Sequence, residues 1–258
     1  MFFFKKSKIT LDVFTYDQTI LETSPILPAI RFYPQWMKDL PGEVPLEIFN
    51  PSSKEVHTVP KLTIKACSAV QDYFKTGFVI PLWTDVSIIV NPDGRYSYSS
   101  ADSPFSIDRN WPMGGVGGFG EYANMRFTVP WHAEEKSGVK FLLRYPAWSS
   151  NTNKILINKF VDACGIIDFK DQHSLHLNTF FELPYEKIEF ILKLGTPIGH
   201  IIPLTEKEVE LKLHLIDENE WVKRTVNSTG AKTYTSRLPK KLLLKEKIKE
   251  GKGCPFKY

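Results

Sequence analysis

The chain has 258 residues, of which 42% are hydrophobic and 24% charged, and its formal net charge is only +4. This composition excludes a disordered chain, a collagen-like repeat and a coiled coil, because it supplies enough apolar surface for a sizeable core. Aromatic residues make up 13% of the chain. Since aromatic side chains favour strands and fill cores, we expect a β-rich domain with appendages.

Neither a membrane span nor a secretion signal is expected. No apolar run approaches the roughly 18 residues of a spanning helix. The apolar start ends at Lys5, whereas a signal peptide carries its charges before the apolar stretch. Cys67, Cys164 and Cys254 include no Cys-x-x-Cys pair, so we expect reduced thiols, no disulfide framework and no metal site.

Residues 1–60 are expected to form an extended N-terminal segment that packs on the core. Residues 8–15 alternate polar and apolar side chains, which predicts a strand. Three prolines between positions 25 and 34 exclude regular strand pairing there, and a short turn is expected from Trp36 to Gly42.

Residues 68–77 give the clearest local pattern of the first half. Ser68 is a candidate cap for a short helix, and Gly77 can supply its left-handed end. The apolar run 78–90 predicts two abutting strands, and the turn 91–94 (Asn-Pro-Asp-Gly) predicts a return strand.

The second half carries turn residues every 8–15 positions, which is typical of a sandwich, a barrel or a similar closed β architecture. We therefore expect a β-rich core domain over 61–216, followed by a short helix near Trp221 and a basic C-terminal arm over 217–258. Further strands are expected at 61–65, 125–129, 139–145, 155–160, 174–182, 187–192 and 198–204.

The last 27 residues are strongly basic. Residues 232–258 hold nine Lys or Arg and two Glu, a net charge of +7, so that residues 1–231 carry −3. One interpretation is an arm that packs on its own protein or on a neighbouring subunit. The other is a nucleic-acid contact through Lys240, Lys241 and Lys245, because lysines can follow a phosphate backbone.

The remaining groups of histidine, cysteine, glutamate and glycine residues are expected to have structural roles. His173 and His176 match no metal signature that the sequence completes. Cys164 is expected to be a small core residue, and the pair Glu134–Glu135 is expected at a solvated hairpin tip. The glycine run 114–120 is neither a P-loop nor a dinucleotide fingerprint, so we expect a loop there.

Residues 130–204 resemble the core of the dUTPase and dCTP deaminase superfamily. The features that carry the resemblance are Arg144-Tyr-Pro-Ala-Trp-Ser-Ser150, Gly165-Ile-Ile-Asp168 and Gly195-Thr-Pro-Ile-Gly-His200. The resemblance implies a β-clip core, in which Asp168 would position a water for attack on a phosphate. Ser149 and Ser150 would then bind phosphates bridged by Mg²⁺, with Trp148 and His200 as further ligand-binding residues.

The same segment departs from the enzymes' pattern. Ala147 and Trp148 stand where the superfamily has its phosphate-binding arginine, Asp171 replaces the stacking tyrosine, and His200 replaces a glutamine. These departures favour a protein that binds a ligand without hydrolysing it. In the alternative, a nucleotide hydrolase, Asp168 would be the catalytic residue.

The whole chain also resembles a family of uncharacterised tailed-phage proteins, through segments such as Thr63-Ile-Lys-Ala-Cys67 and Gly195-Thr-Pro-Ile. The leading hypothesis is therefore a phage-encoded, β-clip-like assembly or binding protein that forms a homo-oligomer, a trimer being one arrangement, and contacts other phage proteins. It would work in the host cytoplasm or the virion and needs no cofactor. The alternatives are a pyrimidine nucleotide hydrolase using Asp168 and Mg²⁺, and a nucleic-acid-binding accessory protein.

Overall fold

The computed structural model describes residues 8–101, 107–109, 121–146, 159–173 and 175–229. As the composition predicts, this part of the chain is mainly β, with several mostly antiparallel sheets and a few short helices. No helix among these residues has the length and apolar character needed to cross a membrane.

The central sheet has five antiparallel strands in the order β13-β11-β16-β5-β2. Ile166 and Ile202 lie opposite the same residue, Leu142, on the two sides of β11. The two glycine-led segments predicted from the sequence therefore enter one sheet. Its strands are β13 (Gly165–Asp168), β11 (Lys140–Arg144), β16 (Pro197–Pro203), β5 (Phe78–Pro81) and β2 (Leu27–Pro28).

Two further antiparallel sheets pack into the same hydrophobic core as the central sheet. Phe127, Phe141 and Phe181 are fully buried in this core. One has the order β12-β14-β9-β8 and the other β15-β6-β7. Their strands are β12 (Phe160–Asp162), β14 (Leu177–Glu182), β9 (Tyr122–Phe127), β8 (Ile107–Arg109), β15 (Ile188–Leu192), β6 (Val86–Val90) and β7 (Tyr96–Ser100).

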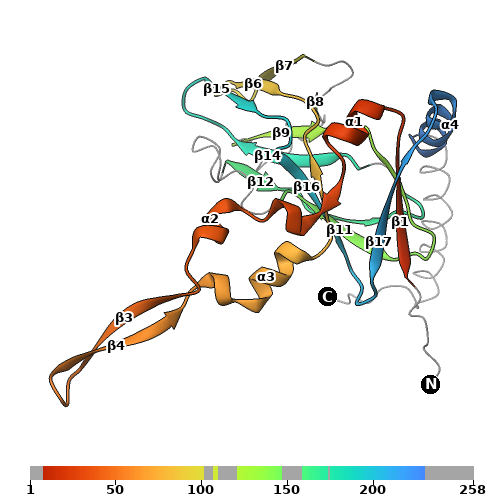
Figure 1. The fold of residues 1–258 in the computed structure, drawn as a ribbon. Coiled ribbons are helices and arrows are strands. Elements are labelled where there is room, and N and C mark those ends of the chain that lie inside the picture. Colours follow the sequence, from red (N-terminus) through yellow and green to blue (C-terminus); the bar gives the residue numbers. More distant parts are fainter. Residues whose placement is uncertain (1–7, 102–106, 110–120, 147–158, 174, 230–258) are drawn as a thin grey trace, which may run out of the picture.

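A three-stranded sheet joins the two ends of the described chain. β1 (Ile9–Thr15) pairs antiparallel with β10 (His132–Glu134) and parallel with β17 (Val209–Leu215), a strand that the sequence did not predict. The helix α1 (Gln18–Thr23) follows β1, and α4 (Glu218–Thr229) follows β17 (Figure 1). Trp221 anchors α4 as expected, since its ring lies 5.1 Å from that of Tyr16.

A long hairpin, which we call the arm, projects from this body (Figure 1). It consists of β3 (Glu43–Asn50) and β4 (Glu55–Leu62), which pair with each other and with no other strand of the described chain. Every residue of both strands is exposed. The prediction that residues 1–60 pack on the core is therefore wrong for the arm, although Leu11, Val13 and Ile26 are buried in the core as expected.

Short helices surround the base of the arm. η1 (Ala29–Phe32) and α2 (Gln35–Asp39) precede it, and η2 (Ile64–Ala66) and α3 (Ser68–Lys75) follow it. The predicted helix at 68–77 is confirmed, and Gly77 has the expected left-handed φ of +81°. The cap prediction is wrong, because Ser68 is the first helical residue and Cys67 stands at the cap without a side-chain hydrogen bond.

Candidate functional site

Asp168, the predicted catalytic carboxylate, ends β13 and is half-buried. Its Oδ1 accepts a hydrogen bond from the N–H of Lys170 at 3.1 Å. Its carbonyl accepts the N–H of Asp171 and the N–H of Gln172, so the residue holds a tight turn by side chain and backbone alike. The described contacts of Asp168 thus organise the chain at the end of β13.

His200, predicted to bind a ligand, is buried in β16 and only 2% exposed. Its Nε2–H donates a hydrogen bond to the carbonyl of Thr76 at 2.7 Å, and its ring meets the edge of Tyr73. Burial lowers the pKa of His200 below its usual 6.5, although the bond to Thr76 opposes this. The imidazole thus fastens the end of α3 to the central sheet.

The structure does not bring Asp168 and His200 together. Asp168 lies opposite Lys140 and His200 opposite Arg144, on the two sides of β11. Four residues along a strand span about 13 Å, which is too far for both side chains to contact one small ligand atom. The other predicted site residues, Trp148, Ser149, Ser150, Lys240, Lys241 and Lys245, lie outside the described residues.

A cavity of about 290 Å³ opens between β11, β13 and the segment that leads into β14. The residues of its lining that carry polar side chains are Arg144, Tyr145, Gln172, His173, His176 and Asn178. Neither Asp168 nor His200 is among the residues that line it. The cavity is lined by Arg144, Gly165 and Ile167, which belong to the segments that carry the resemblance, but by neither of the two described site residues.

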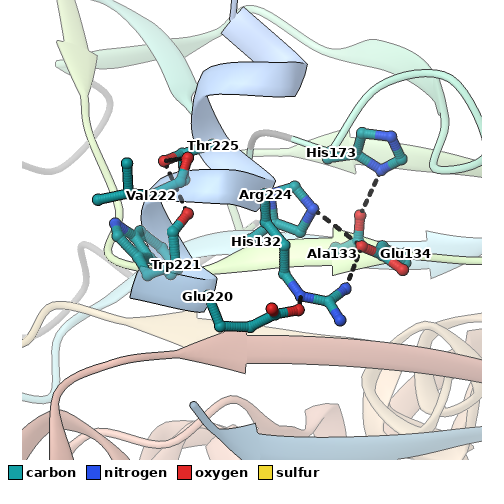
Figure 2. Close-up of polar contacts among 9 residues, drawn as sticks. All are labelled: His132, Ala133, Glu134, His173, Glu220, Trp221, Val222, Arg224 and Thr225. Atoms are coloured by element: carbon teal, nitrogen blue, oxygen red, sulfur yellow. Dashed lines mark hydrogen bonds and ion pairs between the residues drawn. The ribbon is translucent and has the colours of Figure 1, made fainter. Parts of the chain in front are cut away.

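A polar network fastens α4 to the three-stranded sheet (Figure 2). The Arg224 guanidinium forms an ion pair with Glu134 of β10 and a second, 2.8 Å long, with Glu220 on its own helix. Arg224 also lies over the ring of Phe14, with Cζ 4.1 Å from the ring centroid. These contacts fix the orientation of α4 on the body.

His132 is buried beside this network. Its Nε2 lies 3.2 Å from Oε1 of Glu134, and its ring stacks on that of His173 at 4.9 Å. Burial and then the neighbouring His173 lower the pKa of His132 to about 4, with Glu134 opposing them. The ring is thus neutral at pH 7. Within the described residues, no three His, Cys, Asp or Glu side chains gather as a metal ion would require.

The pair Glu134–Glu135 is not at a solvated tip, so that prediction is wrong. Glu134 bonds to Arg224, and Glu135 is only 3% exposed. The Glu135 carboxylate accepts the N–H groups of Ser137, Gly138 and Val139 at 2.7–2.9 Å. Cys164, predicted to be a core residue, is an exposed free thiol. In both cases the neighbouring sequence does not show which side chains the fold encloses.

The arm exposes several large apolar side chains. Its exposed apolar side chains are Val44, Leu46, Ile48, Phe49, Val56, Val59 and Leu62. Phe49 is 59% exposed and Leu62 70%. No prediction from the sequence covered this surface, although two stretches with strand-favouring residues flank the turn Pro51-Ser-Ser-Lys54.

The base of the arm is held by well-defined hydrogen bonds. The Lys65 ammonium donates to the carbonyls of Lys38 and Leu40, both at 2.7 Å. The Thr63 hydroxyl donates to the carbonyl of Pro41 at 2.6 Å, and its N–H to that of Gly42. These bonds join the two chain segments at the base of the arm. They therefore favour one orientation of the arm relative to the body.

Comparisons with protein-family models, curated proteins and solved structures found no significant match to this chain. A functional interpretation therefore depends on the residues themselves.

Proposed function

We propose that the protein is an assembly protein that forms a homo-oligomer through the arm. The observation that carries this proposal is the exposure of large apolar side chains on both faces of a hairpin that pairs with no other strand of the described chain. An isolated two-stranded hairpin is at best marginally stable in water. Docking would bury the arm and stabilise it.

The size of the apolar surface supports docking. Seven exposed apolar side chains offer roughly 500 Å² of apolar area over the two faces of the arm together, whereas the largest apolar patch of a typical monomer is about 300–600 Å². Such patches commonly mark interaction sites. A standard protein interface buries about 800 Å² on each partner, so one face of the arm can supply a substantial part of one side of an interface.

The arm is built to dock by its faces rather than by its edges. Pro45 lies directly opposite Pro60, at the third pair of residues from the base of the arm. Because proline has no N–H, both strands lack an outward-facing donor at this point, which opposes the addition of a third strand. The partner would therefore contact side chains above or below the hairpin.

We also propose that the strands β13, β11 and β16 form the β-clip-like core implied by the resemblance. The pairing of Ile166 and Ile202 with the same residue, Leu142, supports this. On the resemblance to tailed-phage proteins, assembly would take place in the host cytoplasm or in the virion.

The test is the mass of the full chain by light scattering over a hundredfold range of concentration. An armless variant replaces residues 45–60 by Asn-Gly, which favours a two-residue hairpin turn. The control variant, I191S/L194S, removes two equally exposed apolar side chains from the body. We expect an oligomer for the wild type and the control, and a monomer for the armless variant.

Two outcomes would contradict this assembly role. One is a wild type that stays monomeric at every concentration. The other is an armless variant that forms the same oligomer as the wild type, which would place the contact on the body. Circular dichroism of the armless variant checks that the body remains folded.

A further inference from the structure

The two faces of the arm differ in charge pattern. Directly opposed residues of an antiparallel hairpin point to the same side, and successive pairs alternate between sides. The register therefore defines two sets of side chains. The lysine face holds Val44, Leu46, Ile48, Asn50, Glu55, His57, Val59 and Lys61, and the glutamate face holds Glu43, Pro45, Glu47, Phe49, Val56, Thr58, Pro60 and Leu62.

The two opposite charges of the lysine face lie at its two ends. Lys61 lies at the base and Glu55 at the tip, six residues apart along β4, or about 20 Å. This distance excludes an ion pair between them within one arm. The stretch between them carries the exposed apolar side chains Leu46, Ile48 and Val59, together with His57.

We propose that the arm packs on the arm of a second copy of this chain, lysine face to lysine face, with the two arms antiparallel about a two-fold axis. This inference rests on the assembly function proposed above and names its contact. The antiparallel arrangement brings Lys61 of each copy to Glu55 of the other, at both ends of the contact. Leu46 and Val59 of each copy then pack against Ile48 and His57 of the other.

Other arrangements of the same arms place charges unfavourably. A parallel pairing of the lysine faces sets Lys61 against Lys61 and Glu55 against Glu55. Pairing of the glutamate faces encloses four carboxylates, from Glu43 and Glu47 of each copy, with no cation on that face. Burying unpaired charge is strongly unfavourable, so the lysine face is the self-complementary one.

The test exchanges charges between the two ends. The variants K61E and E55K each place like charges at both ends of the symmetric contact, and we expect each to weaken self-association about tenfold. An equimolar mixture of the two variants pairs opposite charges at both ends, so association should return toward the wild-type level. The control is E47K, a charge reversal on the glutamate face of the same arm, which should change association little.

Sedimentation velocity measures the wild type, the three variants and the mixture, and every altered side chain is exposed, so the variants should fold. A mixture that associates no better than either variant would overturn the pairing, as would an E47K loss equal to that of K61E. A wild type that forms only trimers also overturns it, because a two-fold contact cannot close a trimer. In these cases an arm-dependent oligomer still supports the assembly function, whereas a monomeric wild type overturns both proposals.

Discussion

The imidazole of His200 and the carbonyl of Thr76 are joined by a 2.7 Å hydrogen bond that ties the end of α3 to the central sheet. Because α3 follows β4 in the chain, this bond also anchors the base of the arm to the body. A histidine that the sequence marked as ligand-binding is used here to position a structural element.

Replacing His200 by phenylalanine keeps a buried ring but removes the donor. We expect the free energy of unfolding to fall by about 1 kcal/mol, because the hydrogen bond from the buried imidazole to the Thr76 carbonyl is lost. Urea denaturation measures the change. The control is Tyr185→Ala at a fully exposed position, which should leave the midpoint almost unchanged. Equal midpoints for wild type and His200→Phe would show that the bond contributes nothing to stability.

Glu135 provides a second test of buried polar structure. Its carboxylate accepts three backbone N–H groups in the turn before β11. In Glu135→Gln an amide N–H₂ would face those donors, so at least one bond is lost and stability should fall by about 2 kcal/mol. Thermal unfolding can be compared with that of Glu186→Gln, an exposed site. If both variants melt together, the turn does not depend on this charge.

Gly77 combines a left-handed backbone with a close approach. A Cβ at this position would lie 2.1 Å from the carbonyl oxygen of Ile201, whereas at Gly195, with the same φ of +81°, it would meet nothing within 4 Å. We expect Gly195→Ala to cost about 1 kcal/mol, from backbone strain alone. Gly77→Ala should cost at least about 3 kcal/mol, because the sheet must shift. Equal losses in chemical denaturation would contradict the close contact.

The sequence predicted features that depend on neighbouring residues. The α3 helix with its Gly77 ending and the turn between β6 and β7 follow from local capping and turn chemistry, and both are confirmed. The parallel pairing of β17 with β1 joins residues two hundred positions apart, so no local pattern could place that partner.

The arm was missed for a different physical reason. Prolines usually exclude a strand, but Pro45 and Pro60 lie opposite each other where a missing N–H costs no ladder bond. At the expected pocket, the sequence could not show that β11 separates Asp168 from His200, because that separation depends on strand order. The sequence thus predicted which residues are candidates for a site, but it could not predict the distances between them.

The burial of His132 should make stability depend on pH. Its pKa is lowered from 6.5 to about 4 in the folded protein by burial and by His173, while Arg224 and Glu134 also face the ring. Above pH 6.5 the ring is neutral in both states, so its contribution is constant. As the pH falls from 6.5 to 4, the unfolded chain binds a proton that the folded protein does not, and the free energy of unfolding should drop by about 3 kcal/mol.

Urea denaturation at half-unit steps from about pH 8 to pH 4 measures this dependence. Burial of His200 lowers its pKa as well and acts in the same direction, so the informative quantity is the difference between wild type and His132→Asn. The variant should show a distinctly shallower fall in stability over this range. Tyr185→Ala, at a fully exposed position of the body, is the control and should follow the wild type. Parallel curves for wild type and His132→Asn would mean that the buried imidazole is protonated as easily as an exposed one.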